Sequence, residues 1–192
     1  MNKVKYLVIA ILVVAAGAGG FLWTKGRLTG GEIKVKGDSS APTSVPTSQP
    51  IPSYPETVGN FSVTNQEVCT KDGRTLVYFF GATSCTHCTW EKPIIEKVVK
   101  KFGDVVDFHE NIDNSTDSEV FQKYSDINPG YVPFMILGCK YVRVGSGESL
   151  GKDEAESKKL EEEALTAIIC KLTGSKPDSV CASVKDKVAE VK

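Results

Sequence analysis

The feature that most constrains the fold is a pair of cysteines between a short apolar run and a longer amphipathic segment. Residues 75–80 read TLVYFF, and such a run of strand formers predicts a strand buried on both faces. From Thr86 to Phe102, apolar residues recur every three or four positions with Lys and Glu between them, which predicts an amphipathic helix. Cys85 and Cys88 therefore lie where a strand ends and a helix begins.

This position predicts redox chemistry. A thiol at the amino end of a helix faces unpaired N–H groups and the positive end of the helix dipole, which stabilise the thiolate. Cys85 is thus the predicted nucleophile, and Cys88, one helical turn later, is the predicted resolving cysteine. His87 can place positive charge or a hydrogen-bond donor near the Cys85 sulfur. It is predicted to favour the dithiol form and so make the disulfide a stronger oxidant.

A C-x-x-C pair has other interpretations. It can be half of a zinc site, but zinc needs four ligands, and the remaining candidates form no second closely spaced pair: Cys69, Cys139, Cys170, Cys181 and His109. It can also be a purely structural disulfide. The redox pair is favoured, and the alternatives are a non-catalytic, disulfide-stapled binding module and a zinc-binding domain. No metal or other cofactor is predicted.

The rest of the pattern predicts the layers of the domain. Thr64 and Glu67 have the spacing of a capping box for a short helix that holds Cys69. After the first long helix, the expected elements are a strand at 105–112, a helix at 117–124, strands at Phe134–Leu137 and Tyr141–Val144, and a helix at 152–173. Parallel strands joined by a crossover and followed by a hairpin predict a three-layer α/β/α sandwich with a mixed central sheet.

Two segments carry a resemblance to a known family. Residues 79–93, FFGATSCTHCTWEKP, resemble the active-site segment of the thioredoxin superfamily, including the proline five residues after the second cysteine. Residues 128–134, NPGYVPF, resemble the loop of that family whose cis proline faces the disulfide. The resemblance covers about residues 61–173. It implies a thioredoxin-like fold and a thiol-disulfide oxidoreductase that acts on protein disulfides or dithiols.

The resemblance also implies roles for single residues. Pro133 is expected to be cis and to belong to the catalytic site, and Val132 is expected to bind the backbone of a peptide substrate. Thr86 and Trp90, next to the cysteines, are the other expected substrate-binding residues. The histidine in the motif and the residue before the proline favour an oxidase or isomerase over a reductase.

One departure from the family concerns proton transfer. Members of the thioredoxin branch carry a buried carboxylate in the strand before the motif, where this chain has Phe79. Glu91 and Glu96 are the acidic residues that could assist Cys88 instead.

The four remaining cysteines are expected to form two structural disulfides. In the implied sheet, the strand before the motif runs antiparallel to the strand after the cis proline, which brings Cys69 close to Cys139. Cys170 and Cys181 are expected to pair across a helical corner. Six cysteines, an even number, indicate an oxidising compartment.

The amino-terminal part of the chain differs in composition from the rest. Residues 6–23 contain no charge and could span a bilayer as a helix about 27 Å long, so residues 1–25 are predicted to be a transmembrane anchor. A cleaved signal peptide is the alternative, because residues 16–18 read AGA. Residues 26–60, rich in Pro, Ser and Thr, are a predicted stalk.

The predicted organisation continues with a thioredoxin-like domain at 61–174 and a helical extension at 175–192. More positive charge follows the apolar run than precedes it, which opposes an extracytoplasmic domain. The stalk and the cysteines favour that location nevertheless. The expected partners are protein or peptide thiols and disulfides, and a membrane redox partner could recycle the site. A net charge of −1 gives no electrostatic basis for nucleic-acid binding.

Overall fold

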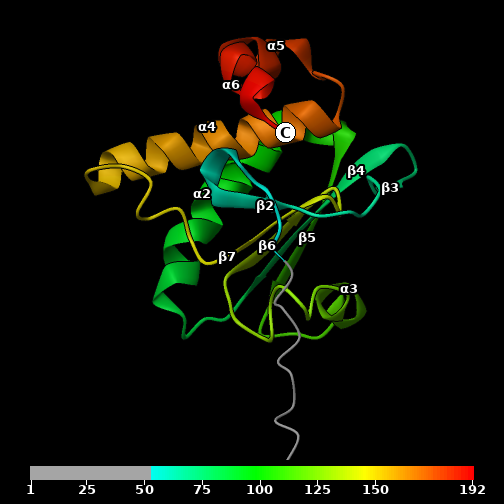
Figure 1. Cartoon of the computed structure of the whole chain (residues 1–192), viewed down its shortest axis with the longest axis vertical. Helices are drawn as coiled ribbons and strands as arrows, with labels where there is room; N and C mark the ends of the chain where they lie inside the picture. Colours follow the sequence, from blue (N-terminus) through cyan, green and yellow to red (C-terminus); the bar gives the residue numbers. More distant parts are fainter. Residues whose placement is uncertain (1–52) are drawn as a thin grey trace, which may run out of the picture. The chain divides into compact units, whose positions relative to one another are not determined.

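The central strand of the sheet is β4 (Arg74–Gly81), the apolar run that precedes the cysteine pair (Figure 1). The computed structural model describes residues 53–192. β4 pairs in parallel with β5 (Val106–Ile112) and antiparallel with β6 (Phe134–Leu137). β6 continues into an antiparallel hairpin with β7 (Tyr141–Val144). The sheet therefore contains one parallel pair at its centre, and its other pairs are antiparallel.

Short strands complete the sheet at its edges. β2 (Phe61–Val63) pairs antiparallel with β7, and β1 (Glu56–Thr57) pairs antiparallel with β2 across the 3₁₀ turn η1 (Val58–Asn60). β3 (Thr70–Lys71) forms a hairpin with the start of β4. The sheet thus begins at Glu56, inside the segment predicted to be a stalk.

One face of the sheet is covered by long helices. α2 (Thr86–Phe102) and α4 (Glu154–Leu172) pack against this face. Val77 and Phe79 of β4 point into the core between sheet and helices, and both are fully buried. The chain ends with α5 (Asp178–Cys181), a 3₁₀ turn at Ala182–Val184, and α6 (Lys185–Glu190), and α6 packs on α4.

The opposite face is covered by a single short helix. Tyr78 and Phe80, which alternate with Val77 and Phe79 along β4, point to this side because successive strand residues face opposite ways. Phe80 and Phe121 of α3 (Ser118–Gln122) meet edge to face with their ring centroids 5.1 Å apart. This smaller core is therefore held largely by aromatic contacts.

The predicted fold class requires a correction. It was a thioredoxin-like three-layer α/β/α sandwich with a mixed central sheet, preceded by a transmembrane helix. The described residues form a mixed α/β domain with a largely antiparallel sheet, in which the second helical layer is reduced to five residues of α3. Among residues 53–192, no helix combines the length and the apolar composition that a membrane crossing requires. The predicted span at residues 6–23 lies outside the described residues.

The segment after β2 also differs from the prediction. The capping box at Thr64 predicted a helix, but residues 64–69 form no helix. The Thr64 hydroxyl accepts the N–H of Gln66 and donates to the carbonyl of Cys139, and the N–H of Cys69 donates to the carbonyl of Gly138 at 3.0 Å. These long-range bonds satisfy the backbone without a helix, so the local signal was overridden by the neighbouring turn.

Two disulfides lie away from the cysteine motif and join the pairs expected from the sequence. Cys69, just before β3, is bonded to Cys139, in the turn between β6 and β7, and their Cα atoms are 5.4 Å apart. Cys170 near the end of α4 and Cys181 of α5 are bonded with their Cα atoms 5.7 Å apart. Both cysteines of the second pair are buried. This second bond fastens the carboxyl-terminal extension to α4.

Candidate active site

The cysteine motif lies in a tight junction between β4 and α2. β4 ends at Gly81, where a Cβ atom would lie 2.8 Å from the Ile112 side chain and 3.3 Å from Cβ of Cys88. Only glycine therefore allows α2 to pack this closely against the strand ends. The following loop is held by Thr83, whose N–H and hydroxyl both donate to the Asp113 carboxylate, at 3.1 and 2.7 Å.

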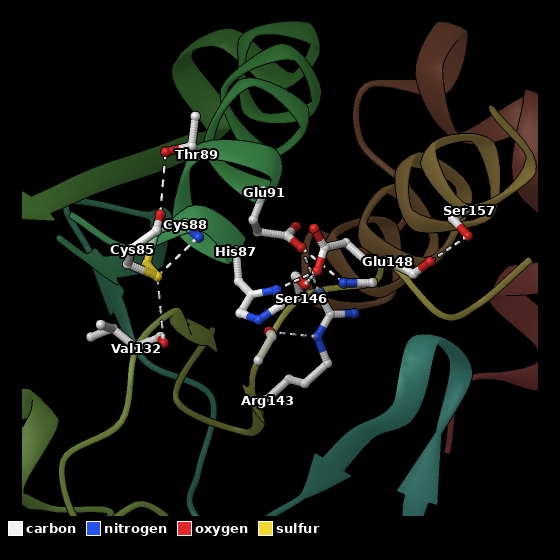
Figure 2. Close-up of polar contacts among 12 residues, drawn as sticks. Cys85, His87, Cys88, Thr89, Glu91, Val132, Arg143, Ser146, Glu148 and Ser157 are labelled. Carbon is white, nitrogen blue, oxygen red and sulfur yellow. Dashed lines mark hydrogen bonds and ion pairs between the residues drawn. A yellow bond between two sulfur atoms is a disulfide. The ribbon is translucent and has the colours of Figure 1, made fainter. Parts of the chain in front are cut away.

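Cys85 is the N-cap residue of α2. Its Sγ accepts the backbone N–H of Cys88 at 3.1 Å, as Figure 2 shows. An N–H donor and the amino end of a helix both stabilise negative charge on a thiol. The site can therefore hold a thiolate at Cys85 once the disulfide is reduced.

Cys85 and Cys88 are joined in a disulfide, so the structure represents the oxidised site. The two sulfur-bearing residues differ in burial. Cys88 is 2% exposed and packs in the main core, whereas Cys85 is half-buried at its edge. An incoming thiolate can therefore reach Cys85 more easily than Cys88.

The second predicted segment lies against the disulfide. The Val132–Pro133 peptide bond is cis, and the Val132 carbonyl oxygen is 3.7 Å from the Cys85 Sγ (Figure 2). The resemblance implied both the cis peptide bond and the position of this loop facing the disulfide. The Val132 carbonyl is the group in the loop that a reduced Cys85 thiol could use as a hydrogen-bond acceptor.

Asn128 supports this loop and was missed by the sequence analysis. It is 1% exposed, its side-chain oxygen accepts the N–H groups of Gly130 and Tyr131, and its amide donates to the carbonyl of Tyr131 at 2.9 Å. The Asn-Pro-Gly sequence is a turn signal that could have indicated such a role. Tyr131, which precedes Val132 in the same loop, is 66% exposed.

A groove runs from the loop along the second face of the sheet. It has a volume of about 520 Å³ and begins beside Val132 and Ala82. Its lining combines the apolar side chains of Phe80 and Phe121 with polar residues: Asn111, Asp113, Asn114, Ser115, Ser118 and Gln122. A chain segment bonded to Cys85 would have this groove next to it.

Thr86 and Trp90, the other expected substrate-binding residues, occupy different environments. Thr86 is exposed in the first turn of α2. Trp90 is half-buried and packs against the main core, so much of its ring contributes to packing. Thr86 is therefore accessible to a substrate, whereas Trp90 contributes mainly to core packing.

His87 points away from the disulfide toward the loop after β7. Its Nδ1 contacts the Glu148 carboxylate, which also accepts the hydroxyl of Ser146 at 2.9 Å (Figure 2). Partial burial acts to raise the pKa of Glu148, but hydrogen bonds from His87 and Ser146 and the charge of His87 hold it below its ordinary value. Sequence reasoning missed Glu148, because it lies 61 residues from His87.

A buried cluster of charged side chains joins α2 to β7 and α4. Arg143 of β7 makes two bonds of 2.6 Å to the Glu161 carboxylate and one of 3.1 Å to Oε2 of Glu91. Both glutamates are fully buried. Oε2 of Glu91 also accepts the N–H of Gly147 at 3.0 Å, whereas its Oε1 has no hydrogen-bond partner in the described part of the chain.

Glu91 and Glu96, the two acidic residues proposed in place of the missing strand carboxylate, differ in burial and in the direction of their pKa shifts. Phe79, at the expected position of that carboxylate, is fully buried in the core. A hydrogen bond from Lys92 lowers the pKa of Glu96, which is half-buried at the surface. Burial, and then repulsion from Glu161, raise the pKa of Glu91 to about 8 against the attraction of Arg143. Glu91 is therefore the acidic group of α2 that retains a proton near neutral pH.

The raised pKa of Glu91 predicts a change in stability with pH. A carboxyl that keeps its proton longer in the folded state than in the unfolded state lowers the unfolding free energy as pH rises from about 4.5 to about 8. Glu91→Gln, which mimics the neutral acid, is expected to gain stability relative to the wild type across this range. The limiting slope is about 1.4 kcal/mol per pH unit. Urea unfolding of both proteins at pH 5, 6, 7 and 8 measures this difference in unfolding free energy. Parallel plots of unfolding free energy against pH for the two proteins would contradict the prediction.

Within residues 53–192, no group of three or more His, Cys, Asp or Glu side chains has the arrangement needed to hold an ion. His109, a candidate ligand in the sequence, instead contacts Asp117 at 3.1 Å and the ring of Tyr78.

Comparison of the chain with known protein families, with curated proteins and with solved structures finds no match.

Proposed function

We propose that this protein is a thiol-disulfide oxidoreductase whose reactive group is the Cys85–Cys88 disulfide. The observation that carries the proposal is the half-buried Cys85 at the amino end of α2, whose Sγ lies 3.1 Å from the backbone nitrogen of Cys88, beside a buried partner cysteine. The resemblance of residues 79–93 and 128–134 to the thioredoxin superfamily supports the same activity.

The proposed reaction is an exchange of disulfides through two steps. A substrate thiolate attacks the Cys85 Sγ, forms a mixed disulfide and expels Cys88 as a thiolate, which takes up a proton. A second substrate thiolate then attacks the substrate sulfur and expels Cys85 as a thiolate. The substrate is oxidised by two electrons to a disulfide, and the Cys85–Cys88 pair is reduced to a dithiol.

The proposed substrates are protein or peptide thiols in an oxidising compartment outside the cytoplasm. Disulfides persist in such compartments and are rare in the cytosol, and all six cysteines of the chain are paired. The groove beside Val132 supports a polypeptide substrate, because a segment flanking the substrate cysteine could lie there. Oxidation or isomerisation is proposed over reduction, since the sequence places His87 between the two cysteines, and a histidine free to approach the Cys85 sulfur favours the dithiol form.

The test is a redox titration of the chain in glutathione buffers, followed by alkylation and peptide mapping. Cys85 and Cys88 are expected to titrate together at about −120 to −180 mV, with the other two disulfides reduced below about −300 mV. A value near about −270 mV would overturn the oxidase or isomerase direction and indicate a reductase. A Cys85–Cys88 pair that does not titrate would overturn the proposal in favour of a disulfide-stapled binding module.

A further inference from the structure

The loop between β7 and α4, residues 145–153, is fastened to both helices of the main face. The N–H of Gly147 donates to the Glu91 carboxylate of α2, and the backbone carbonyl of Glu148 accepts the hydroxyl of Ser157 of α4 at 2.7 Å. Gly147 itself packs against the Glu161 side chain so closely that a Cβ atom would collide with it. The backbone at Glu148 is therefore held in one position relative to the first turn of α2.

From this fixed backbone, the Glu148 side chain reaches the histidine of the motif. Its carboxylate contacts Nδ1 of His87 and accepts the hydroxyl of Ser146 (Figure 2). The Glu148 side chain is 32% exposed and that of His87 is 66% exposed. Glu148 is the better anchored partner, so the contact determines where the more exposed imidazole lies.

We propose that Glu148 is a positioning residue that holds His87 away from the Cys85 sulfur and thereby weakens the oxidising power of the Cys85–Cys88 disulfide. This inference rests on the proposed redox function. Cys85 is the thiol that becomes charged on reduction. His87 is the histidine nearest to it in the sequence, between Cys85 and Cys88.

The direction of the effect follows from charge. Reduction by two glutathione molecules breaks the Cys85–Cys88 bond, forms glutathione disulfide and leaves a Cys85 thiolate and a Cys88 thiol, with the released proton passing to solvent. A cation or N–H donor free to approach Cys85 stabilises this reduced product. The Glu148 carboxylate competes with the thiolate for the His87 ring and adds a negative charge to the site. Both effects disfavour the reduced form, so loss of the carboxylate should favour it.

Glu148→Gln tests this inference in the 192-residue chain by glutathione equilibration at pH 6. Histidine side chains ordinarily carry substantial positive charge at this pH. The equilibrium constant for reduction of the Cys85–Cys88 disulfide is expected to rise about threefold to fivefold, the range expected for a partly exposed ion pair. For a two-electron couple this corresponds to a rise in potential of about 14 to 21 mV.

A second background shows whether Glu148 acts through His87. In His87→Gln, the further change Glu148→Gln is expected to alter the equilibrium constant by less than about twofold. Glu154→Gln, a matched control in an exposed pair with Lys158, is expected to leave the constant unchanged. An unshifted constant in Glu148→Gln, or an equal shift in both backgrounds, would overturn the inference while the proposed function stands. Failure of the proposed function would instead appear as a wild-type disulfide that does not titrate.

Discussion

Cys85→Ser is expected to abolish disulfide exchange, lowering the rate by roughly 10³-fold or more, as loss of a nucleophile commonly does. The hydroxyl cannot form the mixed disulfide on which both proposed steps depend. The same variant also leaves Cys88 without its partner in the core, where it is 2% exposed and poorly accessible to substrate. The rate of oxidation of a dithiol peptide, followed by alkylation and mass spectrometry, measures the loss.

Cys88→Ser provides the comparison that assigns the two roles. This variant keeps the half-buried Cys85 thiol. With a disulfide peptide as substrate, its Cys85 thiolate attacks one substrate sulfur and expels the other as a thiolate, and the resulting mixed disulfide is expected to accumulate because no Cys88 thiol is present to resolve it. The double variant Cys170→Ser/Cys181→Ser, which removes the disulfide between α4 and α5, is expected to keep its activity wherever it remains folded. Full activity in Cys85→Ser, or a mixed disulfide trapped at Cys88 in the wild type, would contradict the assignment.

Arg143→Met is expected to lower the unfolding free energy by about 3 to 5 kcal/mol at pH 7, because it leaves the buried Glu161 carboxylate without its cation. Glu161 is fully buried and receives both of its 2.6 Å bonds from this guanidinium. Arg143 also donates to the carbonyl of Gly59 at 2.9 Å and lies over the ring of Phe61. Its removal therefore also loosens the contact between β7 and the β1–β2 hairpin. Urea unfolding followed by circular dichroism measures the change.

Arg74→Met is the matched control for this prediction. Arg74 pairs with Asp107 at 3.0 Å, but its side chain is 40% exposed, so the loss is expected to stay below about 1 kcal/mol. Equal effects of the two arginine substitutions would show that the buried cluster contributes no more than a surface pair.

The sequence by itself indicated the elements whose residues are close together along the chain. The apolar run of strand formers at residues 75–80 and the helical spacing up to Phe102 predicted β4 and α2, and the observed helix has the predicted bounds. The hairpin of β6 and β7 was predicted in the same way. Cys85 and Cys88 could be singled out because the spacing of two cysteines at a strand-to-helix junction is itself a local property.

The tertiary structure decided what surrounds these elements. The Arg143 cluster draws on β7, α2 and α4, and the contact of His87 with Glu148 joins residues far apart in the sequence. The same is true of the segment that starts at Thr64, where bonds to a distant turn replaced the predicted helix. Local periodicity records only which face of an element is apolar. Burial of a charge and the pairing that compensates it depend on how several elements pack together, so both emerge only in the folded protein.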